Sequence, residues 1–106
     1  EKRKDAQLHY EIEVALPREL NKAQQIELID QFAKEQLTKR GMIVDYSIHH
    51  VEGNPHAHIA YTTREITVDG FGKKIRAWKD KAFLYSIRES WAHATNYALR
   101  KAGFGI

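Results

Sequence analysis

The stretch HHVEGNPHAH, residues 49–58, decides the fold because it joins two strand-like segments through a tight turn. Residues 53–55 supply the Gly-Asn-Pro chemistry of such a turn. On a strand, His56 and His58 point to the same face, whereas on a helix they would diverge by roughly 200°. A hairpin brings His49 alongside them. The stretch therefore predicts three imidazoles on one face of a sheet.

Alternating apolar and polar residues predict three strands around this turn, at 10–16, 42–49 and 56–63. Short connections favour antiparallel pairing of the second and third strands. A smaller hairpin is expected over 65–75, with its turn at Asp69-Gly70. The apolar sets fall on one face and leave a polar set opposite, which consists of Glu11, Glu13, Asp45, Ser47, His49, His56 and His58.

Two amphipathic helices flank these strands. Asn21 is a good N-cap with Gln24 in capping-box position, and Gly41 is the expected residue after the helix end. Asp80 is the expected N-cap of a second helix that ends at Gly103. The expected buried faces are Ile26, Ile29, Phe32, Ala33 and Leu37 in the first helix, and Phe83, Leu84, Ile87, Trp91, Ala94, Ala98 and Leu99 in the second.

The element order predicts one two-layer α+β domain over 1–106, with helices on one face of an antiparallel sheet and a three-histidine metal site on the other. A length of 106 residues is too short for two domains. The absence of cysteine excludes disulfides and thiolate metal sites. The net charge of +3 permits a polyanionic partner. No apolar run approaches the roughly 20 residues needed to span a bilayer.

Three imidazoles with no fourth protein ligand are typical of a catalytic metal site, because they leave coordination positions open. Such a set binds zinc, manganese, nickel or copper readily, and magnesium less tightly. The ligand type alone does not name the metal. A cupin-type site fits less well, since it would need a carboxylate where Thr62 and Thr63 stand. His50 is expected to point away from His49.

Residues 72–81 interleave five cations with one tryptophan, which suits single-stranded DNA through phosphate contacts and base stacking. The competing interpretation is a solvated loop with the tryptophan packed on the core. The candidate DNA-binding residues are Arg64, Lys73, Lys74, Arg76, Trp78 and Lys79.

A histidine followed a few residues on by Asn-Pro-His-x-His resembles the metal motif of the MobA/MobL (MobQ-type) conjugative relaxases, which are HUH (His-hydrophobe-His) endonucleases. The resemblance covers nearly the whole chain and implies the palm of a relaxase domain. Other segments that resemble the family are 11–20, 40–42, 62–64, 88–92 and 96–99.

The resemblance implies metal-dependent nicking and rejoining of one DNA strand at a plasmid transfer origin through a phosphotyrosyl intermediate. His49, His56 and His58 would hold a divalent ion, magnesium or manganese in the cell, with zinc, nickel or cobalt as alternatives. Glu11 and Glu13 would support the site. The implied partners are single-stranded origin DNA, accessory relaxosome proteins and a coupling protein, in the bacterial cytoplasm and with no membrane partner.

Two departures from the family pattern matter. Many relatives carry Asp where this chain has His50. The family's nucleophilic tyrosine lies upstream of the Glu-x-Glu strand, and nothing here matches it. Together with the non-initiator Glu1, this predicts the C-terminal major part of a catalytic domain, without its tyrosine segment. Two alternatives stay open: a replication initiator or transposase that uses Tyr85 or Tyr97, and a non-catalytic metal-holding DNA-binding module. The sequence leaves the oligomeric state open.

Overall fold

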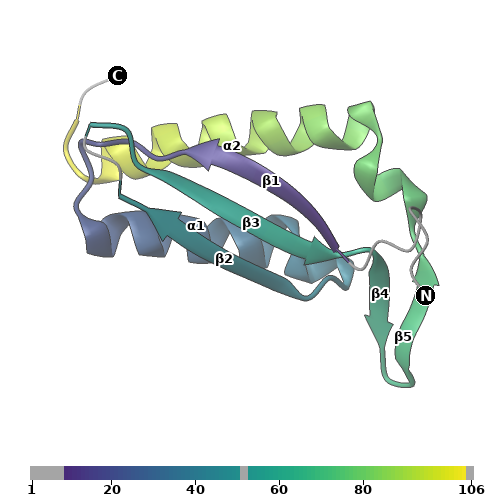
Figure 1. The fold of residues 1–106 in the computed structure, drawn as a ribbon. Helices are drawn as coiled ribbons and strands as arrows, with labels where there is room; N and C mark the ends of the chain where they lie inside the picture. The colour runs from purple at the N-terminus through teal and green to yellow at the C-terminus, as the bar shows by residue number, and fades with distance from the viewer. Residues whose placement is uncertain (1–8, 51–52, 105–106) are drawn as a thin grey trace.

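A three-stranded antiparallel sheet forms one layer of the protein (Figure 1). The computed structural model describes residues 9–50 and 53–104. β3 (His56–Thr62) lies in the centre of this sheet, between β1 (His9–Ala15) and β2 (Val44–His49). Both neighbours run antiparallel to β3, and the short turn at residues 53–55 predicts this for β2.

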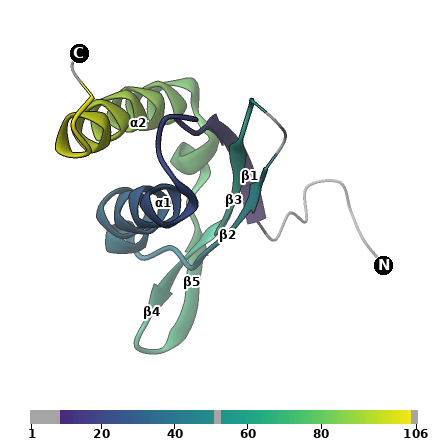
Figure 2. The ribbon, with the colours of Figure 1, turned by 90° about the vertical axis from the view of Figure 1, so that its left-hand side faces the viewer.

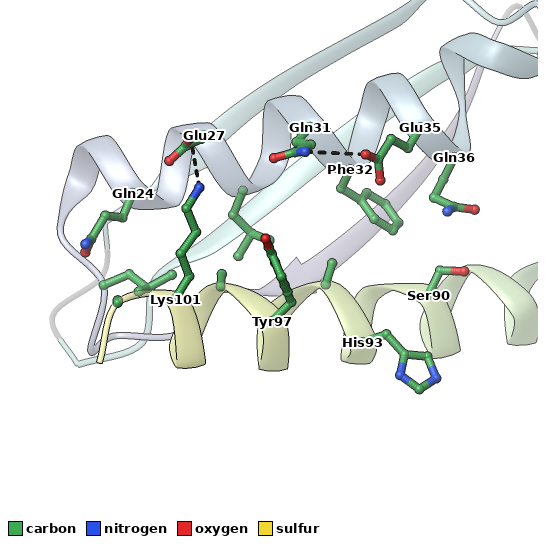
Figure 3. Close-up of a pocket in the computed structure, with 15 residues that line it drawn as sticks. Gln24, Glu27, Gln31, Phe32, Glu35, Gln36, Ser90, His93, Tyr97 and Lys101 are labelled. Atoms are coloured by element: carbon green, nitrogen blue, oxygen red, sulfur yellow. Dashed lines mark hydrogen bonds and ion pairs between the residues drawn. The ribbon is translucent and has the colours of Figure 1, made fainter. Parts of the chain in front are cut away.

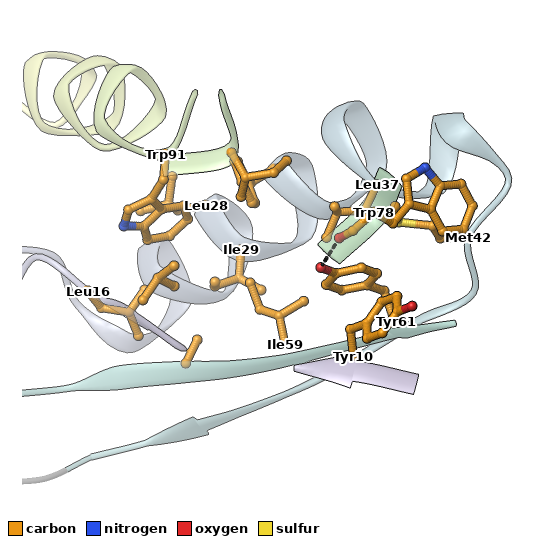
Figure 4. Close-up of a cluster of buried hydrophobic side chains, with 14 of the residues drawn as sticks. Tyr10, Leu16, Leu28, Ile29, Leu37, Met42, Ile59, Tyr61, Trp78 and Trp91 are labelled. Atoms are coloured by element: carbon orange, nitrogen blue, oxygen red, sulfur yellow. Dashed lines mark hydrogen bonds between the residues drawn. The ribbon is translucent and has the colours of Figure 1, made fainter. Parts of the chain in front are cut away.

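Two helices cover a single face of this sheet (Figure 2). They are α1 (Lys22–Gln36) and α2 (Lys81–Lys101). The core lies between the two layers and is built by alternate residues of β3 that meet both helices (Figure 4). Its most buried members are Ile29, Leu37, Ala57, Ile59 and Tyr61. This arrangement confirms the expected α+β class and the expected placement of both helices on one face.

A second, two-stranded sheet extends from the end of β3 (Figure 1). It is the hairpin β4 (Arg64–Thr67) and β5 (Gly70–Lys74), followed by the short 3-10 helix η2 (Arg76–Lys79) that leads into α2. The hairpin is fixed to the main body by two backbone bonds. The Ile66 amide donates to the Gly41 carbonyl at 2.7 Å, and the Ile75 amide donates to the Thr63 carbonyl at 2.9 Å.

The start of α1 is as predicted. The Asn21 side chain accepts from the Gln24 amide at 2.8 Å, and the Gln24 side chain accepts from the Asn21 amide at 2.9 Å. The predicted end is wrong, because α1 stops at Gln36 and the chain tightens into the 3-10 helix η1 (Thr38–Arg40). Gly41, with φ of 96°, ends η1 instead.

One further expectation about α1 needs correction. Ile26 is 48% exposed, because α1 turns Gln25 inward instead. The side-chain amide of Gln25 donates to the backbone carbonyls of Pro17 and Leu20, which fixes the rotation of the helix. Asp80 is the N-cap residue of α2, as predicted, and its side chain makes no capping hydrogen bond.

Neither helix is a candidate membrane span. Within residues 9–50 and 53–104, no helix combines the length and the hydropathy needed to cross a bilayer.

Gly41 lies where the β4–β5 hairpin is fixed to the main body. Its φ of 96° disfavours any side chain, and an added Cβ would lie 2.8 Å from Cγ of Glu65. Gly53 has a φ of 74° with open space around it, so it isolates the backbone cost. We expect Gly53→Ala to lower the free energy of unfolding by about 1 kcal/mol and Gly41→Ala to lower it by more. Urea unfolding of both variants measures the difference.

Adding Glu65→Ala to the Gly41→Ala variant removes the steric contact and leaves only the backbone cost. The double variant should therefore regain stability toward that of Gly53→Ala. No recovery would show that the close approach of β4 to Gly41 is not the source of the difference.

Candidate functional site

Three histidines lie together on the sheet face that the helices leave open. His49 of β2 stands directly opposite His56 of β3 in the register, and His58 follows two residues along β3. The ring centroids of His49 and His58 are 4.7 Å apart. The core residues Ala57 and Ile59 alternate with them, which forces the imidazoles to the opposite face. The structure thus brings together the histidines that strand parity grouped.

The carboxylate of Glu13 lies between two of these rings. Glu13 is on β1, opposite His58. Its Oε2 is 3.4 Å from Nε2 of His58 and 3.5 Å from Nε2 of His56. At 51% side-chain exposure Glu13 is well solvated, so these contacts contribute little to folding stability. Their effect is on the orientation of the rings, because one carboxylate can orient two imidazoles.

Glu11 stands apart from this cluster. It pairs in register with Ala60, and its Oε2 lies 3.4 Å from Nε2 of His9. The two glutamates share a face of β1, which is why the sequence could not separate them. Only the register across β1 and β3 shows that Glu13 is the one beside His56 and His58.

The rings of His49 and His58 are close, but the side chains of the cluster do not form a ready coordination shell. In the part of the chain that the structure describes, no group of three or more His, Cys, Asp or Glu side chains is placed so as to hold a metal ion. The backbone shows the shared face of the three histidines and the position of Glu13 beside it. Rotation of the imidazole side chains would be needed to bring their three nitrogens together.

The predicted DNA-binding cations lie at the other end of β3 from the histidines (Figure 1). Arg64 begins β4, and its guanidinium donates to the Gly72 carbonyl at 3.0 Å. Lys73 and Lys74 are on β5, Lys74 being half-buried. Arg76 and Lys79 are exposed residues of η2.

Trp78 does not fit the predicted role in DNA binding. It is only 6% exposed and packs in the core with Tyr61 and Met42 (Figure 4), so it offers no surface for base stacking. The Tyr61 hydroxyl donates to the Trp78 carbonyl at 2.9 Å. Burial, and then the neighbouring Tyr10, raise the pKa of Tyr61 to about 12. The competing interpretation of Trp78 as a core residue is the one the structure supports.

None of the five tyrosines in the sequence lies on the histidine face. Tyr10, Tyr46 and Tyr61 have the strand parity of the core face. Tyr85 and Tyr97 lie on α2, behind the sheet, and are 68% and 59% exposed. This placement argues against the alternative in which one of these two attacks a phosphate held at the histidines.

Tyr97 instead lines a groove between α1 and α2 (Figure 3). The groove has a volume of about 690 Å³. Phe32 lies on the α1 side, and His93 and Lys101 lie on the α2 side. It faces away from the three histidines and shares no residue with them.

The chain belongs to the MobA/MobL family, which matches over residues 1–105. It is 46% identical over 74 residues to a probable conjugal transfer protein TraA of Sinorhizobium fredii, a match that covers 70% of this chain and 7% of that protein. It is 32% identical over 120 residues to mobilization protein A of Escherichia coli, covering 95% of this chain and 17% of that protein. The chain therefore spans a small part of these relatives.

A solved structure with the same fold supports this assignment. Its title is "Molecular Basis of Vancomycin Resistance Transfer in Staphylococcus aureus". The TM-score is 0.81 and the identity is 36%, over 91% of this chain and 53% of that one.

Proposed function

We propose that this chain supplies the metal site and part of the DNA-binding surface of a relaxase. In this proposal the intact enzyme nicks and rejoins one strand at a plasmid transfer origin through a phosphotyrosyl intermediate. The observation that carries the proposal is the cluster of His49, His56, His58 and Glu13 on the open face of the sheet. It occurs in a chain whose relatives are named conjugal transfer and mobilization proteins.

The chemistry of the donor set fits a divalent cation. His49, His56 and His58 would hold it, because each neutral imidazole offers one nitrogen lone pair. Facing residues on neighbouring strands have Cβ atoms about 5 Å apart, so imidazole rotation without a change of register can gather the three nitrogens. When bound, the cation would polarise a scissile phosphate oxygen. Manganese or magnesium is the proposed ion in the cell.

Glu13 is the proposed positioning residue of this site. An imidazole that donates one N–H to a carboxylate has its ring orientation and tautomer fixed, and its other nitrogen faces the metal. The Oε2 of Glu13 is within 3.5 Å of both His56 and His58, whereas Glu11 contacts His9. Glu11 is therefore assigned no comparable role.

The cations on the hairpin and on η2 are the proposed phosphate contacts. Arg64, Lys73, Lys74, Arg76 and Lys79 gather on one continuous segment, and phosphate neutralisation dominates affinity for nucleic acids. Single-stranded origin DNA is the proposed substrate, and accessory relaxosome and coupling proteins are the proposed partners. The proposed compartment is the bacterial cytoplasm.

The nucleophile is the part of the reaction that this chain does not provide. No tyrosine of the sequence lies on the histidine face, and in this proposal the attacking tyrosine comes from polypeptide outside this sequence. The chain's own residues would hold the cation, orient two of its imidazole ligands and bind the phosphates. A metal-holding DNA-binding module that never cuts is the second candidate, and the same distribution of tyrosines favours it.

Metal affinity tests the role of Glu13. We expect Mn²⁺ to bind the 106-residue chain, and Glu13→Gln to weaken binding by about tenfold because His56 and His58 lose their orienting carboxylate. Glu11→Gln is the matched control and should bind like the unmodified chain. Isothermal titration calorimetry gives the dissociation constants. Equal weakening by both substitutions would remove the special role of Glu13, and no binding by the unmodified chain would contradict the metal site.

Nicking tests the proposed reaction. We expect no cleavage of a transfer-origin oligonucleotide by this chain with Mn²⁺, and cleavage by a polypeptide that continues it on the N-terminal side. In the longer polypeptide, His58→Ala should abolish cleavage, whereas Tyr85→Phe with Tyr97→Phe should leave it unchanged. A covalent protein–DNA adduct on a denaturing gel is the readout. Loss of cleavage in the double Tyr→Phe variant would support an initiator-type or transposase-type nucleophile instead.

Salt dependence tests the phosphate contacts. The plot of log K against log salt has a negative slope, and each lost contact to single-stranded DNA reduces the magnitude of this slope by roughly 0.7. We expect Lys73→Ala with Arg76→Ala to lower it by about 1.4. Lys22→Ala with Lys34→Ala, on α1, is the charge-matched control and should leave the slope unchanged. Fluorescence anisotropy at several salt concentrations measures it, and an unchanged slope in the first variant would assign Lys73 and Arg76 to the solvated surface.

A further inference from the structure

The groove between α1 and α2 has the shape of a seat for a third helix (Figure 3). Its two walls run antiparallel, because Lys101 near the end of α2 lies 3.9 Å from Glu27 in the first half of α1. Along α1 the groove extends from residue 24 to residue 36, which is about 18 Å at 1.5 Å per residue. This length matches slightly more than three turns of a helix.

The floor of the groove is apolar and allows close approach. Leu28 and Phe32 of α1 and the half-buried Ala94 and Ala98 of α2 are among its lining residues. The distance between packed helices depends on the side chains at the contact, so two alanines one turn apart let another helix lie near α2. The groove is concave and therefore fits a convex partner.

Tyr97 stands exposed beside this floor. It is 59% exposed, and its side chain points from α2 toward α1 (Figure 3). Tyrosine is enriched among the few residues that carry most of the binding energy of an interface, because its ring offers a large contact area and its hydroxyl can form a hydrogen bond. Tyr97 is therefore the expected anchor on the α2 side of the groove.

The charge of the groove differs from that of the whole chain. Glu27, Glu35 and Lys101 line it and give a net charge of −1, whereas the chain carries +3. Lys101 lies beside Glu27 at one end. At the other end the carboxylate of Glu35 accepts from the neutral side chain of Gln31 at 3.4 Å, and no cation among the described residues pairs with it. The Glu35 end therefore favours a partner with a cation there.

A second copy of this chain does not supply the required helix. The large apolar residues that are exposed on the described helices are Ile26 of α1 and Tyr85 and Tyr97 of α2. Ile26 is alone on its helix, and Tyr85 and Tyr97 are more than three turns apart. A helix that fills a groove presents apolar anchors at i, i+3 or i+4, and i+7, and neither helix of the chain has such an exposed series.

We propose that this groove binds an amphipathic helix of a separate protein. The helix would place apolar side chains at i, i+4 and i+7 over Leu28, Phe32 and the two alanines. On the edge that faces Glu35 it would carry lysine or arginine. This inference goes beyond the proposed relaxase function, because it requires neither the cation nor DNA.

Selection from a peptide library tests the proposal with the 106-residue chain. The probes are displayed helical peptides of about 20 residues, with leucine fixed at i, i+4 and i+7 and the edge positions randomised. We expect the enriched peptides to carry lysine or arginine on one edge. Selection on Glu35→Lys should enrich aspartate or glutamate there instead. Glu89→Lys, at an exposed α2 position outside the groove, is the matched control and should keep the original preference.

Affinity measurements locate the binding site of an enriched peptide. Tyr97→Ala should weaken binding by about tenfold, the effect of removing a residue that anchors an interface. Tyr85→Ala removes an equally exposed tyrosine of the same helix outside the groove, and should leave the affinity unchanged. Fluorescence anisotropy of the labelled peptide gives the dissociation constants.

Several results would overturn the proposal. No enrichment, or equal binding to Tyr97→Ala and Tyr85→Ala, would show that the groove does not take a helix. An edge preference that Glu35→Lys leaves unchanged would contradict the basic partner. Dimerisation of the unmodified chain that Tyr97→Ala abolishes would assign the groove to a second copy. Loss of peptide binding in a longer polypeptide containing this chain would assign it to the same polypeptide. Failed metal binding or nicking would contradict only the relaxase function.

Discussion

The antiparallel ladder that β3 forms with both of its neighbours is the constraint on which the structure depends. Because side chains alternate along a strand, the burial of Ala57, Ile59 and Tyr61 against the helices forces His56 and His58 to the open face. A shift of β3 by one residue against its two neighbours would turn His56 and His58 toward the core. The same hydrogen bonds therefore determine the core and the candidate metal site.

The ladder also separates the proposed cation site from the cations of the hairpin, which lie at opposite ends of β3. The start of β3 lies beside His49 and Glu13, at the proposed cation site. Its end leads into the hairpin, where the positive charge of the chain concentrates. In the proposed function, a nucleic acid along the sheet would meet the proposed phosphate contacts at one end and the proposed metal site at the other. The two helices pack on the opposite face of the sheet (Figure 2).

Much of the fold and of the candidate site could be predicted from local sequence. Strand parity grouped the three histidines, and the capping box of Asn21 and Gln24 placed the start of α1, because both depend only on neighbouring residues. The exposure of Ile26 was mispredicted, because the Gln25 side-chain amide ties the helix to the preceding loop and sets its rotation. The end of α1 was also mispredicted, because the chain tightens into the 3-10 helix η1 before Gly41. Trp78 looked equally suited to base stacking and to the core, and only its packing beside Tyr61 decided between them.

The sequence by itself determined the α+β class, the hairpin turn at residues 53–55 and the shared face of the histidines, because each follows from periodicity or turn chemistry within one segment. The tertiary structure alone chose Glu13 over Glu11, placed Tyr85 and Tyr97 behind the sheet, and set the hairpin at the far end of β3. These features depend on contacts between segments distant in the chain, and residue spacing within a segment carries no information about which strands pair or in what register.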